Sequence, residues 1–196
     1  VKYTTRGGEV IVRAAVAEAG VIPVIGPIGD VTVDEGALLA LTATAIDADL
    51  PAQTLTFALG AGAPAGAAID AATGAFTWTP SEAQGPGTYE IRVVVSDGEL
   101  MAAEAFTVTV AEVNIAPVLG SIGSKTVNEL ASLTFTATAT DADLPANALT
   151  FSLGAGAPAG ASITAAGTFT WTPSEAQGPG SYPVTITVSD GTATDS

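Results

Sequence analysis

Apolar residues alternate with threonine or serine along most of the chain, which is the period of a half-buried β-strand. The clearest segment alternates Leu133, Phe135, Ala137 and Ala139 with threonines at 134, 136, 138 and 140. The pattern recurs at Leu149/Phe151/Leu153, Phe169/Trp171 and Val184/Ile186/Val188. Turns separate these segments, as at APAG, where Pro64 suits the second turn position and Gly66 the fourth. The pattern predicts many short strands and essentially no helix.

The chain contains one long internal repeat. IPVIGPIGDVTVDEG at 22–36 recurs as APVLGSIGSKTVNEL at 116–130, an offset of 94 residues. DADLPA, LGAGAPAGA and TWTPSEAQGPG recur as well, with one residue deleted in the second copy between Ile163 and Phe169. Copy one predicts seven short strands in about 90 residues, which indicates a two-sheet β-sandwich. The sequence therefore predicts an all-β protein of two tandem sandwiches.

The two copies of this repeat do not contain the same set of predicted strands. Copy one ends with AEAFTVTVAEVN, in which Phe106, Val108 and Val110 are predicted to face inward on the last strand. Copy two stops at VSDGTATDS and is predicted to lack that strand. VIVRAAVAEAGVIPV at 10–24 aligns instead with EAFTVTVAEVNIAPV at 104–118, which predicts a surplus strand whose interface positions are Val10, Val12, Ala14 and Val16. The predicted divisions are a donor-type strand over 1–20, a first sandwich over 21–113 and an incomplete second sandwich over 114–196.

Two interpretations of these edges stay open. In the first, residues of about 8 to 17 of one chain complete the second sandwich of a neighbour, and repetition gives a head-to-tail fibre. In the second, the chain is an excerpt of a longer array of the same repeat, and both the missing and the surplus strand result from the cut. The chain starts at Val1 without a methionine or signal peptide, which fits either a processed protein or an excerpt.

Composition narrows the function classes. The net charge of -15 opposes a nucleic-acid partner and favours cations. The chain has no cysteine and no histidine, which excludes disulfides and thiolate metal sites and predicts a protein that is not an enzyme. The sequence contains no run of about 18 apolar residues, so it does not predict a membrane-spanning helix. Trp78 and Trp171 could stack on sugars, but each follows an inward Phe by two residues, which favours core packing.

Each copy reads as APV…TVxE…ATxxDADLP…LTF…GAPAGA…GxFTWTPSE…GxY…VSDG. This pattern resembles the cadherin-like and putative-Ig (dystroglycan-type) tandem repeats of large bacterial or archaeal surface proteins, over nearly the whole chain. The resemblance implies a Greek-key immunoglobulin/cadherin-like sandwich, an extracellular or cell-surface location, and calcium bound between successive domains.

The resemblance also implies a ligand set at the junction of the two copies. Glu35 and Glu82 resemble the glutamates at the bottom of a cadherin domain, and Asp141, Asp143 and Asp190 resemble the aspartates at the top of the next. With Glu112 and Asn114 of the linker, seven oxygen-bearing side chains are available, which suits Ca²⁺. In a head-to-tail fibre the junction would repeat, with Glu129 and Glu175 of one chain and Glu18, Asp47, Asp49 and Asp97 of the next.

Two departures reduce the number of ions expected. Ile115 stands where the family usually carries another acidic residue, and Gly20 replaces an asparagine in the first linker. The alternative to metal binding is that Asp47 and Asp141 cap turns and that the other carboxylates are solvated surface charge.

These observations predict a structural subunit of an extracellular filament, polymerised head-to-tail by donor-strand complementation, with Ca²⁺ at its domain junctions. The alternative is an excerpt of a long repeat-array adhesin or carbohydrate-binding surface protein. The predicted partner is the chain itself, with surface glycans or other cells as further partners, and no nucleic acid.

Overall fold

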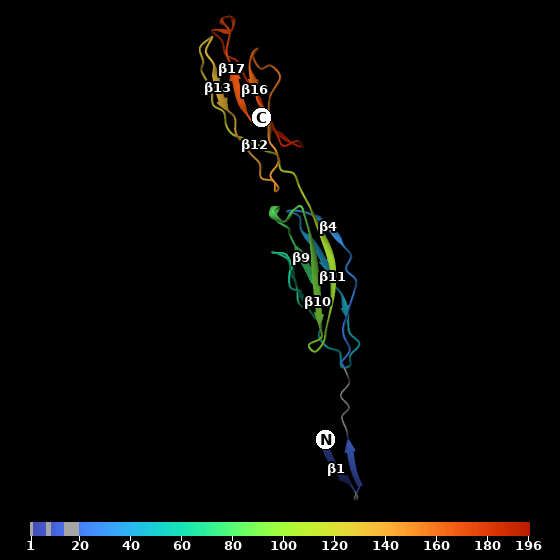
Figure 1. The fold of residues 1–196 in the computed structure, drawn as a ribbon. Helices are drawn as coiled ribbons and strands as arrows, with labels where there is room; N and C mark the ends of the chain where they lie inside the picture. The colour runs from blue at the N-terminus through green and yellow to red at the C-terminus, as the bar shows by residue number, and fades with distance from the viewer. Residues whose placement is uncertain (1, 7–8, 14–19) are drawn as a thin grey trace. The chain divides into compact units, whose positions relative to one another are not determined.

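The computed structural model of the protein describes residues 2–6, 9–13 and 20–196 (Figure 1). Its elements are short β-strands and two three-residue 3₁₀ turns, η1 (Glu82–Gln84) and η2 (Glu175–Gln177). The chain divides into two compact units. The first contains the described residues up to Val33 with Ala37–Thr79 and Thr88–Thr109, and the second contains Asp34–Gly36, Pro80–Gly87 and Val110–Ser196.

The first copy of the repeat forms two sheets and a short strand pair. One sheet has the order β4 (Val31–Asp34), β11 (Met101–Ala111), β10 (Gly87–Ser96) and β7 (Thr56–Leu59). The other has the order β5 (Leu39–Thr42), β9 (Ala75–Trp78) and β8 (Ala68–Ile69), while β3 (Val24–Ile25) pairs with β6 (Ala45–Ile46). Nine strands, β3 to β11, therefore replace the predicted seven, because the chain makes two-residue pairings that the alternation alone does not resolve. The order is a Greek key.

The core of this sandwich follows the predicted alternation. Phe106, Val108 and Val110 of β11 are at most 2% exposed, which confirms that they face inward. The ring of Phe106 packs edge-on against Phe76 of β9, with centroids 5.8 Å apart, so the last strand contacts the opposite sheet. Trp78 is also buried and donates its indole N–H to the carbonyl of Ala65 at 3.1 Å. The prediction that this tryptophan belongs to the core is confirmed.

The APAG turn lies one position later than predicted. The amide of Ala67 donates to the carbonyl of Pro64, which makes Pro64 the first residue of the turn and Gly66 the third. Gly66 has φ +85°, the left-handed conformation that the third position of a type II turn requires. The second copy repeats the turn, with Ala161 donating to Pro158. The predicted placement of Gly66 at the fourth position is wrong for this reason.

The second copy forms the same sheets in shorter form. β13 (Leu133–Thr136), β17 (Thr168–Trp171) and β16 (Ser162–Ile163) make one sheet. β15 (Thr150–Leu153), β18 (Ile186–Ser189) and β19 (Thr194–Asp195) make the other, and β12 (Val118–Leu119) pairs with β14 (Ala139–Thr140). Phe169 and Val188 are buried at its centre.

The second sandwich is short where the last strand of the first one lies. β19 occupies only the beginning of that strand. Residues 125–128 form no strand, although their counterpart in the first copy is β4, whose partner in the sheet is β11. β18 begins only at Ile186, and Pro183, which has no N–H group, stands where the first copy has Glu90 within β10. Without a long last strand among the described residues, both neighbouring segments lack a partner strand for their backbone hydrogen bonds.

The amino end contains two strands instead of one. β1 (Lys2–Arg6) pairs antiparallel with β2 (Glu9–Arg13), in a register that runs from Lys2 opposite Arg13 to Arg6 opposite Glu9. Of the predicted donor positions, Val10 and Val12 lie on β2, whereas Ala14 and Val16 lie outside the described residues. The surplus strand is thus one half of a hairpin. Among the described residues there is no helix of the length and apolarity that crossing a membrane requires.

Candidate metal sites and an open groove

The first carboxylate cluster lies in the first unit and consists of Asp47, Asp49 and Asp97, with one oxygen of each within 4.8 Å of the others. Asp49 accepts the amide of Val21 at 2.9 Å and donates its own amide to Asp47 at 2.8 Å. Asp97 accepts the amides of Leu100 and Glu99, both at 2.7 Å, in the turn after β10. These hydrogen bonds lower the pKa of Asp97 and favour its charged form.

The second cluster, Asp141, Asp143 and Asp190, repeats this geometry in the second unit. Asp143 accepts the amide of Ile115 at 2.8 Å and donates its amide to Asp141 at 3.0 Å. Asp190 accepts the side-chain amide of Asn114 at 3.0 Å. The backbone amide of Ala193, this amide of Asn114 and the amide of Thr192 lower the pKa of Asp190. The repeat therefore preserves both the carboxylates and their hydrogen bonds to the linker.

The third cluster consists of Glu35, Glu82 and Glu112, again with oxygens within 4.8 Å. Glu35 is 7% exposed and accepts the amide of Val113 at 3.0 Å. A Cβ atom at Gly85 would collide with the carboxylate of Glu35, so a larger residue there would displace that carboxylate from its present position. Desolvation raises the pKa of Glu112, and the negative charges of Glu35, Glu82 and Asp143 raise it further. Like charges are thus crowded in this cluster.

The second and third clusters belong to one compact unit and are connected within it. Glu82 accepts the amide of Leu144 at 2.9 Å, next to Asp143. Glu112 and Asn114 come from the same linker segment, directly after β11. All seven residues predicted for this junction therefore lie in these two clusters or donate to them.

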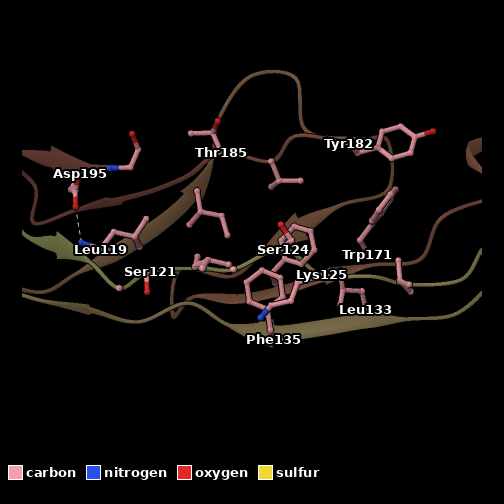
Figure 2. Close-up of a pocket in the computed structure, with 18 residues that line it drawn as sticks. Leu119, Ser121, Ser124, Lys125, Leu133, Phe135, Trp171, Tyr182, Thr185 and Asp195 are labelled. Atoms are coloured by element: carbon pink, nitrogen blue, oxygen red, sulfur yellow. Dashed lines mark hydrogen bonds between the residues drawn. The ribbon is translucent and has the colours of Figure 1, made fainter. Parts of the chain in front are cut away.

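A groove runs along the second sandwich beside the truncated edge (Figure 2). Its main part, about 770 Å³, is bounded by Leu119, Ser121 and Ser124 on one side and by Tyr182, Thr185 and Asp195 on the other (Figure 2). Leu133, Phe135, Phe169 and Trp171 form its floor. An adjoining part follows residues 124–129 and 177–182. The groove therefore has apolar side chains at its base.

The groove occupies the place that β11 takes in the first sandwich. Ile91 of β10, the strand next to β11, is fully buried, whereas its counterpart Val184 is only half-buried. Phe57 is buried, but its counterpart Phe151 is also only half-buried. The ammonium group of Lys125 lies over the ring of Phe135, 5.6 Å from its centroid. The floor of the groove, with its half-buried Leu133 and Phe135, thus lies where β11 packs in the first sandwich.

Comparison with known families identifies the repeat. The model of the putative Ig domain family matches residues 22–111 and again residues 116–196. The chain belongs to this family. Two tandem putative Ig domains confirm the predicted fold class and the predicted resemblance.

Solved structures with similar folds share little sequence with the two putative Ig domains. Domains EC1–2 of human protocadherin-24 align at 17% identity with a TM-score of 0.47, covering 87% of this chain and 87% of that one. An endo-fucoidan hydrolase of glycoside hydrolase family 107 aligns at 21% identity and a TM-score of 0.43, and the alignment covers 90% of this chain but 27% of the hydrolase. Immunoglobulin domains 1–4 of Sidekick-1 align at 13% identity and 0.44, covering 88% and 46%. No curated protein matches the chain.

The clusters of these putative Ig domains have the chemistry that a hard cation requires. Buried carboxylate oxygens of Glu35, Asp97, Asp47 and Asp141 have no hydrogen-bond partner among the described residues. Glu35 and Asp97 are both more than nine-tenths buried. Leaving a buried charged oxygen without a partner is costly, and a Ca²⁺ ion with six to eight oxygen ligands would satisfy it. The donors are all oxygen atoms, as Ca²⁺ prefers over soft metals.

The structure does not assemble the remaining predicted ligands. Glu129 and Glu175 are exposed and belong to no cluster of three among the described residues, and Glu18 lies outside them. In the first sandwich the third carboxylate, Glu112, follows directly after β11, and the second sandwich has no described counterpart of that segment. The prediction that Glu129, Glu175 and Glu18 share a site is untested.

Sequence reasoning missed two amide side chains. Gln53 donates to Asp49 at 3.3 Å, and its repeat counterpart Asn147 donates to Asp143 at 2.8 Å. The side-chain oxygen of Gln53 is buried without a partner and is therefore a further candidate ligand. The available signal was the recurrence of an amide four residues after the second aspartate in both copies.

Proposed function

We propose that the protein is a structural subunit of an extracellular filament, in which the amino-terminal strand of one copy completes the second putative Ig domain of the next. The observation that carries this proposal is the groove in the second sandwich, where β11 lies in the first. An open sheet edge beside exposed core side chains accepts an added strand readily.

The sequence supplies a strand of the required pattern. Residues 10–24 align with residues 104–118, which include most of β11 and the linker after it. The alignment places Val12, Ala14 and Val16 where Phe106, Val108 and Val110 are buried. Burying three or four such side chains contributes about 5–10 kcal/mol before the cost of association. A contact between copies would then be persistent.

Calcium is the second part of the proposal. The ligands would be the three clusters: Asp47, Asp49 and Asp97; Asp141, Asp143 and Asp190; and Glu35, Glu82 and Glu112. Their partnerless buried oxygens and their oxygen-only donor set support this assignment. Bound Ca²⁺ would neutralise crowded carboxylates and fix the linker residues that are hydrogen-bonded to them. The role is therefore mechanical and not catalytic.

An adhesin or sugar-binding role has less support. Trp78 and Trp171 are 1% and 8% exposed, so neither offers an open ring face for a sugar to stack on. Domains of the putative Ig and cadherin types are typical of extracellular proteins, which agrees with a filament outside the cell.

Electron microscopy of the purified 196-residue chain tests strand donation. The intact chain should form long fibres at millimolar calcium, whereas a variant lacking residues 1–20 should form none while keeping its β-sheet circular dichroism. Equal fibre formation by both variants, or a stable monomer from the intact chain, would overturn the proposed polymerisation.

Thermal unfolding tests the calcium sites on the same protein. Calcium should raise Tm and a chelator should lower it, because a ligand that binds only the folded state stabilises that state. Glu35→Gln should reduce the calcium-dependent shift, because it weakens the third cluster and leaves the other two intact. Asp34→Asn is the matched control, since Asp34 is exposed and belongs to none of the clusters. An equal calcium response in wild type and Glu35→Gln would contradict the assignment of Glu35.

A further inference from the structure

The strand β2 is already paired within its own chain. Its five residues face the five residues of β1, for example Val10 opposite Thr5 and Ile11 opposite Thr4. One of the two hydrogen-bonding edges of β2 is therefore occupied by β1. The proposed function uses β2 as a donor strand, so the fate of this pairing matters.

A strand inserted into the groove would form backbone hydrogen bonds along both of its edges. In the first sandwich β11 is an interior strand, with β4 on one side and β10 on the other. The groove of the second sandwich has the corresponding two walls, formed by residues around 124–128 and by residues 182–186. A donor strand that pairs with both walls has no free edge for β1. Pairing of β2 with β1 and full insertion of β2 are thus mutually exclusive.

The register of insertion follows from β19. Val188 lies opposite Asp195 and Ser189 opposite Thr194, so the antiparallel register places Thr187 opposite Ser196. By the repeat, Ser196 corresponds to Ala103 and Val10 to Glu104, so a donor beginning at Val10 continues the strand without a gap. In this register Ile11 lies opposite Thr185.

The same register leaves no place for the first nine residues in the completed sheet. They would meet Ser196 and the strand β19, which already fill the start of the last strand. The segment that contains β1 must therefore leave the sheet when β2 enters it.

We propose that β1 guards the donor strand: the β1–β2 hairpin is the storage form of the subunit, and polymerisation exchanges β2 from β1 to the groove of another copy. This inference rests on the proposed function. The hairpin covers one edge of a strand that would otherwise be exposed in the free subunit, which limits premature association.

A disulfide lock tests the exchange, because the chain has no cysteine of its own. Thr5 and Val10 are directly opposite each other, and such pairs have Cα atoms about 4.5–5.5 Å apart, within the range that a disulfide spans. The double variant Thr5→Cys/Val10→Cys should form no fibres while oxidised and should polymerise like wild type after reduction. The single variant Val10→Cys is the matched control for the altered donor strand.

A second pair of cysteines reports insertion itself. Ile11→Cys with Thr185→Cys should crosslink neighbouring copies in fibres, since Thr185 and Ala105, the counterpart of Ile11, are both exposed. Ile11→Cys with Ser152→Cys should not crosslink, because Ser152 lies on β15, on the far side of β18. A variant lacking residues 1–8 should polymerise with a shorter lag than the intact chain.

The outcomes separate this inference from the proposed function. Crosslinked fibres that grow equally well from the oxidised hairpin would overturn the guard role of β1 and leave strand donation in place. A lag that is unchanged by removal of residues 1–8 would also overturn it. Absence of fibres and of Ile11–Thr185 crosslinks in every variant would overturn both.

Discussion

The electrostatic cost of crowding carboxylates without a metal ion is clearest at Glu112. Desolvation and the charges of Glu35, Glu82 and Asp143 raise its pKa, so the folded protein without metal binds this proton more tightly than the unfolded chain does. A raised carboxyl pKa means that stability decreases as the pH rises from the ordinary glutamate value of about 4.5 through the raised value.

This sign gives a pH prediction for the calcium-free protein. Its Tm should fall as the pH rises above about 4.5 through the raised pKa of Glu112, and calcium should abolish the fall. Glu112→Gln should remove the pH dependence in that range, as measured by thermal unfolding in chelator. Asp97 and Asp190 titrate in the opposite sense, because their lowered pKa values give stability that is lost only as the pH falls below their ordinary range. A Tm that rises with pH above 4.5 in chelator would contradict the effect of Glu112.

The sequence predicted the carboxylates of the clusters, but it did not predict the side chains that form hydrogen bonds with them. Asp141 and Asp143 could be chosen because they recur at the same place in both copies. The hydrogen bond from Asn147 to Asp143 could not be predicted, because it depends on how the loop after Asp143 folds back. Glu129 resembles Glu35 in sequence but is exposed, because the residues that cover Glu35 follow a strand that the second sandwich lacks among its described residues.

Among the elements, β11 and β19 show how much one strand contributes. β11 buries Phe106, Val108 and Val110. In contrast, β19 is two residues long, and the apolar side chains that a full-length last strand would cover are only half-buried. The counterpart of β4 does not form beside the groove, since a strand needs a partner for its backbone groups.

Extending the chain tests this argument directly. Fusing a copy of residues 104–114 after Ser196 should fill the groove from within the same chain, because Ser196 corresponds to Ala103. We expect a monomer that forms no fibres and has a second sandwich of higher Tm, as seen by sedimentation and calorimetry. The matched control carries Asp at the copied positions of Phe106 and Val108, and it should neither fill the groove nor block assembly. A fusion that still polymerises like the intact chain would show that the groove is not the acceptor.

The alternation predicted that strands exist but not how long they are. Val184 carries the same pattern as Ile186 and Val188, yet β18 begins only at Ile186. Strand length is decided by the neighbouring strand, which lies far away in sequence or in another copy. The pairing of β1 with β2 was missed for a related reason, since KYTTR carries no strong apolar alternation of its own.

For the whole molecule, the net charge of -15 works against association of copies. Screening of this charge should speed assembly, so light scattering in chelator should show faster polymerisation at 150 mM KCl than at 20 mM, where the Debye length is about two to three times longer. Calcium at equal ionic strength should accelerate assembly further, because it binds and does not only screen. A rate that falls as KCl is added would indicate that opposite charges drive the encounter.

At the scale of the whole molecule, the fold class and the tandem arrangement were predictable because the chain repeats itself. Two copies of one pattern fix the number of sandwiches, and the mismatch between copies points to the truncated edge. The groove itself required the structure, because its floor combines Phe135, Phe169 and Trp171 from strands that the sequence does not order into a sheet.

Lys125 gives the open edge of the second sandwich a further property. An exposed edge usually invites indiscriminate pairing with any extended chain, including the amyloid-like stacking of identical edges. Lys125 lies in the segment that borders the groove where the first copy has β4, and a charged lysine on an exposed edge discourages pairing with an arbitrary strand. A strand whose side chains fill the groove gains from the apolar floor regardless. The edge is therefore selective, and it discourages aggregation while leaving a place for one matching sequence.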